Sequence, residues 1–158
     1  MNSDLIDDYD LRYERFFNSS HFIHGFDLKE ELHGHNYAVI FYVKGPEFGG
    51  YEKFKAKVDL VCAQMDNKVL IAEDCETVDT QVSENEVLVV LGGNSFYRLP
   101  KECCYIMNEI NSTAECIARY FFNVTQADLE PGWKKVKVVV AEIYQQQEAI
   151  YRVINNSL

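Results

Sequence analysis

Two histidines separated by one residue stand at the head of a run that has the composition of a β-strand. His33 and His35 flank Gly34 and lead into residues 36–43, which are rich in aromatic and β-branched side chains. In a strand, residues i and i+2 point to the same face of the sheet. Both imidazoles are therefore expected to reach one ion, and this requirement constrains the fold more than any other feature of the chain.

A third histidine, His21, closes an alternating run over residues 11–22 that predicts a preceding strand. A loop over residues 24–32 would join the two strands and let them pair. Three neutral imidazoles suit Zn²⁺, and three protein ligands leave a fourth position open for water or substrate, as in catalytic zinc sites. The pattern predicts a zinc site of His21, His33 and His35. The alternative is that these histidines are ordinary strand residues without a metal.

The composition fits a single globular domain over residues 1–158. Hydrophobic residues make up 47% of the chain, enough for a sizeable core. Residues 1–9 lack periodicity and are expected to be flexible. An acidic beginning and the lack of a long apolar run predict a cytoplasmic protein with no membrane partner. The net charge of −10 argues against nucleic-acid binding, which depends on cationic contacts. The five cysteines are expected to be free thiols.

Two helices are predicted from apolar residues at helical spacing. One covers residues 51–65, and the other begins near Ser112 and continues through Phe121. Ser112 and Glu115 have the S-x-x-E spacing of a capping box, in which each side chain bonds a backbone N–H at the start of the helix. This capping role accounts for Glu115 without any function.

Further strands are predicted around this helical material. Residues 86–91 and 96–99 flank a Gly-Gly-Asn turn and predict a β-hairpin. The chain ends with two apolar runs, residues 135–143 and 148–154, joined by a polar segment. Two strands, then helical material, then two strands predict an α+β fold, in which an antiparallel sheet carries helices on one face.

Five short segments also follow one another in a recognisable order. They are F-N-S-S-H-F-I at residues 17–23, L-H-G-H-N-Y at 32–37, V-C-A-Q-M-D at 61–66, N-S-T-A-E at 111–115 and V-V-V-A-E at 138–142. Together they resemble the 6-pyruvoyl-tetrahydropterin synthase family, which also includes the 6-carboxy-tetrahydropterin synthases. The resemblance covers nearly the whole chain.

This resemblance implies a fold, an assembly and a site. The fold would be the tunnelling fold (T-fold), with a four-stranded antiparallel sheet and helices on one face. The assembly would be a homohexamer, a dimer of trimers with active sites at subunit interfaces. The site would bind Zn²⁺ and a small pterin substrate, which Glu142 would anchor by accepting two parallel N–H bonds on its carboxylate. Glu115 falls in a family substrate-binding motif, although the capping box explains it as well.

The catalytic base departs from the usual family pattern. Most members carry a cysteine four residues before the first histidine of the H-G-H pair, and an Asp-His pair further along. Here these positions hold Lys29 and then Asp66-Asn67, so only the aspartate is kept. A subgroup found in malaria parasites and some bacteria instead has a glutamate three residues before that histidine, which corresponds to Glu30. The adjacent Glu31 is the alternative.

The resemblance therefore predicts a zinc-dependent lyase that acts on 7,8-dihydroneopterin triphosphate. The reaction would cleave the side chain to give 6-hydroxymethyl-7,8-dihydropterin, with Glu30 as acid and base, and with Asp66 as a second catalytic candidate. Two alternatives stay open: a conventional 6-pyruvoyl- or 6-carboxy-tetrahydropterin synthase, and a pterin- and zinc-binding homologue without turnover. Lys29 and Lys68 are candidates for holding the triphosphate.

Overall fold

A long β-hairpin forms the middle of the molecule. The structure, a computed structural model, describes residues 8–47 and 49–156. Strands β1 (Leu11–Gly25) and β2 (Leu28–Lys44) pair antiparallel along their whole length. The predicted loop over residues 24–32 is therefore wrong, because only Phe26 and Asp27 lie outside the strands. Both adopt the left-handed conformation, with φ of 54° and 59°, which is the backbone of a tight two-residue turn.

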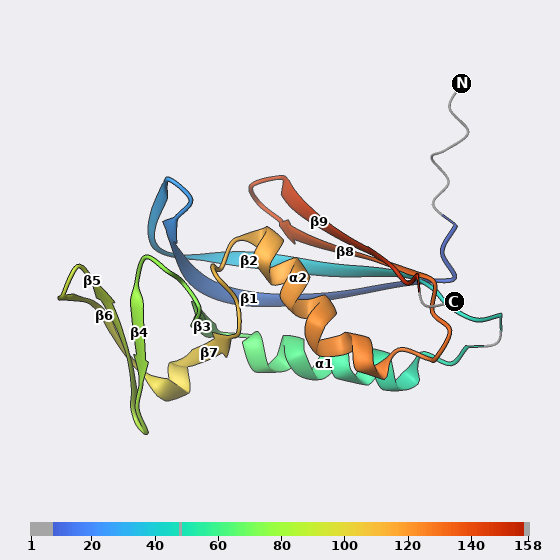
Figure 1. The fold of residues 1–158 in the computed structure, drawn as a ribbon, viewed down its shortest axis with the longest axis horizontal. Helices are drawn as coiled ribbons and strands as arrows, with labels where there is room; N and C mark the ends of the chain where they lie inside the picture. The colour runs from blue at the N-terminus through green and yellow to red at the C-terminus, as the bar shows by residue number, and fades with distance from the viewer. Residues whose placement is uncertain (1–7, 48, 157–158) are drawn as a thin grey trace.

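A six-stranded sheet surrounds this hairpin in the order β7-β3-β1-β2-β8-β9 (Figure 1). The four long strands are antiparallel and include β8 (Lys135–Glu142) and β9 (Gln147–Ile154), as predicted. Two short strands that the sequence did not indicate, β3 (Lys68–Ala72) and β7 (Cys104–Met107), extend the sheet in parallel beyond β1. The α+β class with helices on one face is confirmed.

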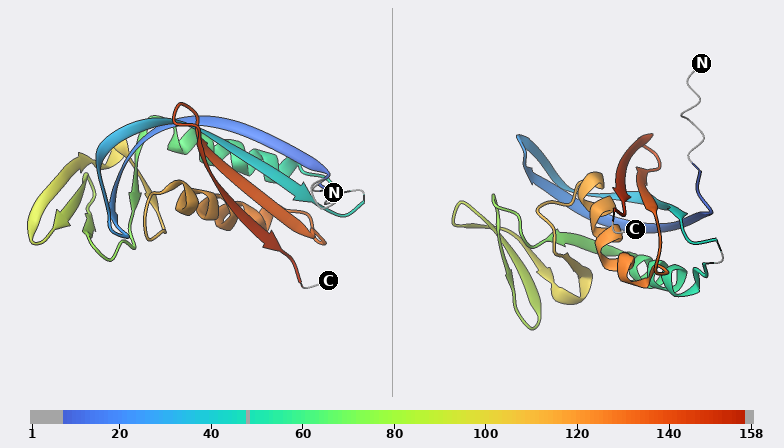
Figure 2. Two further views of the ribbon diagram at one scale, coloured as in Figure 1. Left: turned by 90° about the horizontal axis from the view of Figure 1, so that it is seen from above. Right: turned by 45° about the vertical axis from the view of Figure 1, so that its right-hand side comes forward.

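Both helices pack under the same concave face of this sheet, as the left view of Figure 2 shows. Helix α1 (Glu52–Met65) packs mainly on β1, and helix α2 (Ala114–Thr125) packs mainly on β8 and β9, and the apolar faces of both helices join one core with the hairpin. Phe41 of β2 contacts Phe54 of α1 and Phe121 of α2, with ring centroids 5.0 and 6.1 Å apart. These contacts fix the helices to the strands that carry the histidines. Short 3₁₀ turns, Lys101–Cys103 and Gln126–Asp128, complete the helical structure.

Helix α2 begins one residue later than the capping box predicted. Thr113, not Ser112, is the N-cap, and its hydroxyl accepts a hydrogen bond from the Cys116 N–H. The Ser112 hydroxyl instead donates to the carbonyl of Phe22 at 2.8 Å, which ties the start of α2 to β1. The capping-box reading of Glu115 is therefore wrong.

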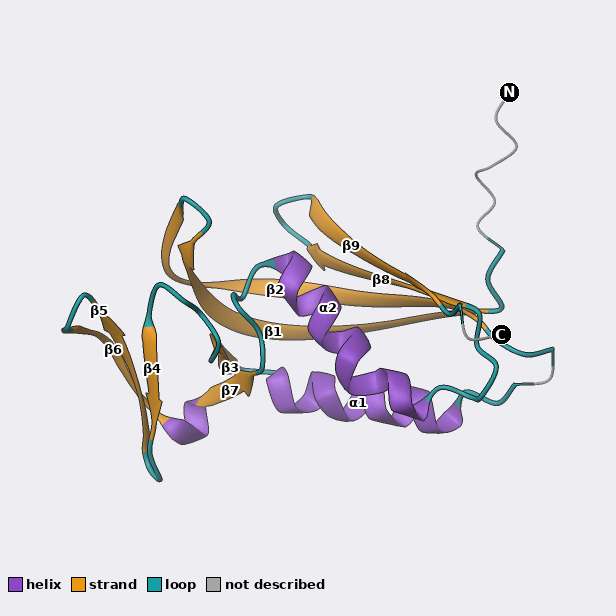
Figure 3. Ribbon diagram, in the orientation of Figure 1, coloured by secondary structure: helices purple, strands orange, loops and turns teal. Residues whose placement is uncertain are grey.

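A second, smaller sheet lies beside the end of the long hairpin, as Figure 3 shows. It contains the predicted hairpin as β5 (Glu86–Leu91) and β6 (Asn94–Pro100), with β4 (Asp79–Val82) added at the edge of β5. Val87 and Val89 bury their side chains in an apolar cluster with Phe22 of β1. This cluster joins the second sheet to the strand that carries His21.

Three further predictions concern the cysteines, residues 1–9 and membrane association. All five cysteines are free thiols. Of the segment predicted to be flexible, residues 1–7 lie outside the described residues, whereas the Tyr9 ring lies 5.6 Å from that of Tyr42. Neither described helix is long and apolar enough to cross a membrane.

Candidate metal centre and adjoining pocket

The three predicted metal ligands meet on one face of the β1–β2 hairpin. His21 lies directly opposite His33 in the strand register, and His35 follows two residues along β2. One ring nitrogen from each histidine lies within 4.8 Å of the others, and the Nε2 atoms of His21 and His33 are 3.2 Å apart. His21 is fully buried, and His33 is about one-third exposed at 33% of its side chain. The site is therefore buried on the side of His21 and open to solvent on the side of His33.

Hydrogen bonds to backbone carbonyls fix the orientation of two of the rings. His21 Nδ1 donates to the carbonyl of Ser112 at 2.7 Å, and His33 Nδ1 donates to the carbonyl of Glu31 at 2.6 Å. Because a carbonyl can only accept, each Nδ1 carries the proton and each neutral ring keeps its lone pair on Nε2. Two lone pairs facing each other at 3.2 Å repel unless a cation lies between them.

The donor set fits zinc. Two nitrogens bound to one tetrahedral zinc lie about 3.3 Å apart, given Zn–N bonds of about 2.05 Å. The His21–His33 separation of 3.2 Å is close to this value. Carbonyl partners on Nδ1 are the usual support for a histidine that binds metal through Nε2.

Two glutamates flank the histidines. Glu30 Oε2 lies 3.4 Å from His33 Nε2, and Glu142 Oε1 lies 3.8 Å from His35 Nε2. The Glu142 side chain is mostly buried, at 12% exposure, whereas that of Glu30 is 47% exposed. One carboxylate thus lies on each side of the triad. The sequence predicted both positions as site residues, and the structure brings both to the histidines.

A β-bulge in β2 explains why Glu30 reaches His33. Three residues separate them, and in a regular strand such an odd spacing would place the side chains on opposite faces. The register changes between His21 opposite His33 and Ile23 opposite Glu30. One residue of β1, Phe22, therefore faces two residues of β2, Glu31 and Leu32. This extra residue turns Glu30 to the face of the histidines.

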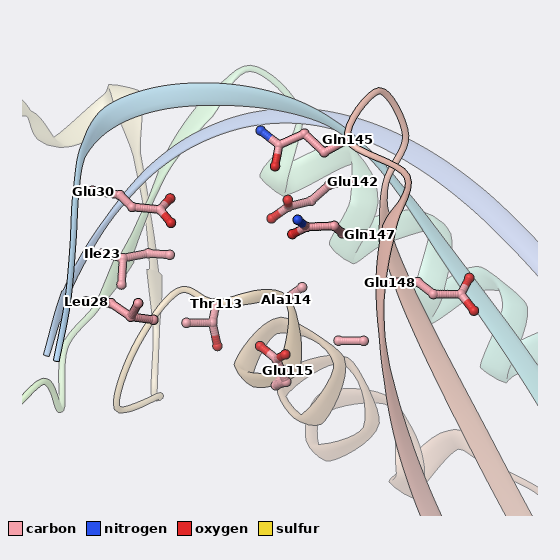
Figure 4. A pocket seen from close by; sticks show the side chains of 11 residues that line it. Ile23, Leu28, Glu30, Thr113, Ala114, Glu115, Glu142, Gln145, Gln147 and Glu148 are labelled. Atoms are coloured by element: carbon pink, nitrogen blue, oxygen red, sulfur yellow. The ribbon is translucent and has the colours of Figure 1, made fainter. Parts of the chain in front are cut away.

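A pocket of about 400 Å³ opens between the two glutamates. Figure 4 shows Glu30 on the side of the long hairpin, Glu142 on the side of the β8–β9 hairpin, and Glu115 at the start of α2 below them. Ile23 and Leu28 supply apolar surface next to Glu30. The remaining lining residues are Thr113, Ala114, Gln145, Gln147, Glu148 and Ala149.

Asp66 lies outside this pocket. Its carboxylate accepts a hydrogen bond from the Asn18 N–H at 2.8 Å, at the C-terminal end of α1. Lys68 lines a separate pocket that also contains His35 and Asn67, and its ammonium group donates to the carbonyl of Glu102. Within this chain, therefore, neither Asp66 nor Lys68 lies at the pocket that holds Glu30.

Several residues of the site were not predicted individually. Gln145 and Gln147 enter the pocket from a segment that the sequence marked only as polar. Tyr37 is fully buried with its ring 5.4 Å from that of His35, and its hydroxyl has no hydrogen-bond partner among the described residues. Burial raises the pKa of this phenol, so the hydroxyl keeps its proton.

The buried His21 makes the stability of the metal-free protein depend on pH. Burial lowers the pKa of His21 from 6.5 to about 4, with smaller contributions from His33 and His35. The unfolded chain therefore binds a proton at this position as pH falls below 6.5, while the folded chain does not. We expect the unfolding free energy to fall between pH 6.5 and 4, by on the order of 3 kcal/mol.

Urea unfolding of the chelator-treated protein at pH 7, 6 and 5 measures this effect. The His21→Asn variant removes the titrating group and should lose the slope between pH 7 and pH 5. Equal unfolding free energies of the unsubstituted protein at pH 7 and pH 5 would contradict the expectation.

Comparisons with known proteins agree with this geometry. The sequence matches the family model for 6-pyruvoyl tetrahydropterin synthase over residues 10–154. The crystal structure of the Plasmodium vivax 6-pyruvoyl tetrahydropterin synthase is similar, with a TM-score of 0.76 and 25% identity, covering 92% of this chain and 100% of that chain. The Plasmodium falciparum protein gives 0.75 and 23%, covering 91% and 99%. No curated protein sequence matches the chain.

A further similar structure is a P. vivax variant in which alanine replaces a glutamate described as a catalytic residue, with a TM-score of 0.75 and 24% identity over 92% of this chain and 100% of that chain. The fold is the tunnelling fold of these structures. The family match spans nearly all of the residues that the structure describes. The chain therefore belongs to the 6-pyruvoyl tetrahydropterin synthase family of pterin-biosynthesis lyases.

Proposed function

We propose that the protein is a zinc-dependent lyase that cleaves the side chain of 7,8-dihydroneopterin triphosphate to give 6-hydroxymethyl-7,8-dihydropterin. The observation that carries the proposal is the position of Glu30, with its carboxylate 3.4 Å from His33 Nε2 and facing the same pocket as Glu142. A glutamate is also described as a catalytic residue in the P. vivax relative. His21, His33 and His35 would hold the zinc.

In this proposal Glu142 and the apolar wall of the pocket orient the pterin. The two carboxylate oxygens of Glu142 would accept parallel N–H bonds from the amino group and ring nitrogen of the pterin edge. Ile23 and Leu28 would contact the ring face, and the C6 side chain would extend toward the histidines. Zinc bound by the histidines would act there as a Lewis acid on the side-chain hydroxyls.

Glu30 would act first as the general base and then as the general acid. Its carboxylate would take the proton of the hydroxyl on the second side-chain carbon, and the bond between the first and second carbons would break. The second carbon would leave as an aldehyde that carries the triphosphate. The bonding electrons would pass to the first carbon, which Glu30 would then reprotonate. The hydroxymethyl group of the product would be left on the ring, and no oxidant is required.

Family membership favours a second candidate, a conventional synthase that eliminates triphosphate to give a 6-pyruvoyl product or forms a 6-carboxy product. Glu30 would then replace the usual cysteine. A homologue that binds zinc and pterin without turnover is the third candidate. These three functions differ in their products, so product identity separates them.

The test is to incubate the zinc-loaded protein with 7,8-dihydroneopterin triphosphate and to identify the products by mass spectrometry. A chelator-treated sample is the control. Formation of 6-hydroxymethyl-7,8-dihydropterin that depends on zinc supports the proposal. A 6-pyruvoyl or 6-carboxy product, or bound substrate without any product, overturns it in favour of the corresponding alternative.

Glu142→Gln is expected to weaken pterin binding while zinc stays in place. The substitution removes the charge from the carboxylate and replaces one acceptor with a donor, which loses about 1.5–3 kcal/mol of charge-assisted hydrogen bonding. This corresponds to an increase in Kd of about 10- to 150-fold. Fluorescence titration with 7,8-dihydropterin measures Kd, and metal analysis measures zinc. Glu148→Gln is the matched control, because Glu148 also lines the pocket but is not one of the two glutamates that lie beside the histidines. If Glu142→Gln had the same Kd as Glu148→Gln and the unsubstituted protein, Glu142 would not bind the pterin.

We further propose that the protein is a cytoplasmic homohexamer with sites at subunit interfaces. In the described part of the chain, β7 and β9 form the two edges of the main sheet, so each leaves one row of backbone groups available to a second copy. Sedimentation equilibrium measures the assembly mass, and a mass of one chain at micromolar concentration would contradict this proposal.

A further inference from the structure

The β-bulge beside His33 is held from outside the main sheet. The Leu32 N–H, which lies in the bulge, donates to the hydroxyl oxygen of Tyr97 at 3.0 Å. On the other side of the same bulge, the carbonyl of Glu31 accepts the Nδ1 proton of His33. The bulge takes the Leu32 N–H and the Glu31 carbonyl out of the regular hydrogen-bond ladder of the strand, and the side chains of Tyr97 and His33 satisfy them instead.

Tyr97 comes from the second sheet, 65 residues away from Leu32 in the sequence. It lies on β6, and its ring packs against Phe22 with centroids 5.0 Å apart and against Phe96 at 4.4 Å. Phe22 is the residue of β1 that faces the bulge. Tyr97 therefore contacts both sides of the irregularity, through its ring on β1 and through its hydroxyl on β2.

We propose that Tyr97 is a positioning residue that holds the bulge in β2 and thereby keeps the Glu30 carboxylate turned toward His33. The second sheet then has a role in the reaction, because it supplies the side chain that fixes the register between Glu30 and the metal ligands. The kinetic part of this inference rests on the proposed function of Glu30. The structural part, that the Tyr97 hydroxyl holds the bulge, does not.

Tyr97→Phe tests the effect of the Tyr97 hydroxyl separately from the effect of its ring. The variant keeps the packing on Phe22 and Phe96 and loses only the acceptor for the Leu32 N–H. Small misplacement of a catalytic group costs up to about 100-fold in rate, so we expect kcat to fall by about 10- to 100-fold. We expect KM and zinc content to change by less than about twofold, because Glu142 and the histidines are untouched.

A double-substitution cycle tests whether Tyr97 acts through Glu30. In a Glu30→Gln background, Tyr97→Phe is expected to lower the residual kcat by less than about twofold, because the group that it positions is already gone. A purely structural role would lower kcat by the same factor in both backgrounds. Equal factors would overturn the proposal.

Tyr105→Phe is the matched control. It also removes one aromatic hydroxyl, which lies 2.9 Å from the hydroxyl of Tyr120 between β7 and α2, away from the bulge. This variant should retain kcat within about twofold, since it leaves Glu30 and its strand in place. A loss of kcat equal to that of Tyr97→Phe would show a general effect on the fold and would overturn the proposal.

Amide hydrogen exchange of the zinc-loaded protein gives a measurement that needs no turnover. Leu32 should exchange at least about 10-fold faster in Tyr97→Phe than in the unsubstituted protein, with β8 unchanged. If the unsubstituted protein turns over no pterin, the proposed function fails, and Leu32 exchange alone then decides the structural part. Unchanged Leu32 exchange overturns the proposal in either case. Faster exchange with an undiminished kcat shows that the bulge does not position Glu30, and also overturns it.

Discussion

Glu30→Gln is expected to lower kcat by about 10²- to 10⁴-fold, the usual contribution of a positioned general acid and base. Glutamine keeps the size of the side chain and its place 3.4 Å from His33 Nε2, but it cannot take a proton. Steady-state kinetics with product detection measures the loss. Zinc content should not change, because the proposed metal donors are three ring nitrogens and do not include Glu30.

Glu31→Gln is the control for this prediction, and the sequence alone left both glutamates open. The Glu31 side chain is exposed and does not line the pocket, whereas its backbone carbonyl supports His33. The substitution changes only the side chain, so kcat should stay within about threefold. Loss of activity in Glu31→Gln together with retention in Glu30→Gln would reverse the assignment.

His33→Ala is expected to remove stoichiometric zinc. Even the loss of a group that only supports a metal ligand costs about 10- to 100-fold in metal affinity, so the loss of a ligand should cost more than about 100-fold. His33 is the best ligand to replace, because it is partly exposed and its loss leaves the core intact. His21 is fully buried, and replacing it would also disturb packing. Titration against a chelating dye measures affinity.

His24→Ala provides the comparison for the zinc measurement. His24 is the fourth histidine of the chain and its Nδ1 lies 2.9 Å from the Thr77 hydroxyl, outside the cluster of three. This variant should bind one zinc per chain with unchanged affinity. Stoichiometric, tightly bound zinc in His33→Ala would show that the zinc has other ligands.

The histidine cluster could be predicted because strand geometry is strongly constrained. Residues two apart in a strand share a face, so His33 and His35 needed only a partner strand in the correct register. The apolar alternation of β1 placed His21 on that partner. Helix α1 was equally predictable, since its buried residues follow a simple helical period over residues 52–65.

The details around the catalytic candidates depend on contacts between distant parts of the chain. The N-cap of α2 is Thr113 and not the predicted Ser112, because the Ser112 hydroxyl donates to the carbonyl of Phe22 on β1. The bulge that selects Glu30 is contacted by Tyr97, from a different sheet. Local sequence patterns carry no information about such distant partners, so the family resemblance could favour Glu30 over Glu31, but the sequence could not show which of the two side chains faces the histidines.

The extra residue in β2 also decides which side chains before His33 share a face with its ring. In an unbroken strand, a side chain four residues before His33 lies on the same face as its ring, and one three residues before lies on the other face. This chain has Lys29 at the first of these positions and Glu30 at the second. A single inserted residue exchanges the two faces, so Glu30 gains access to the three histidines and Lys29 loses it. An alignment that places side chains only by their spacing from His33 would therefore assign the wrong residue to the histidine face of this chain.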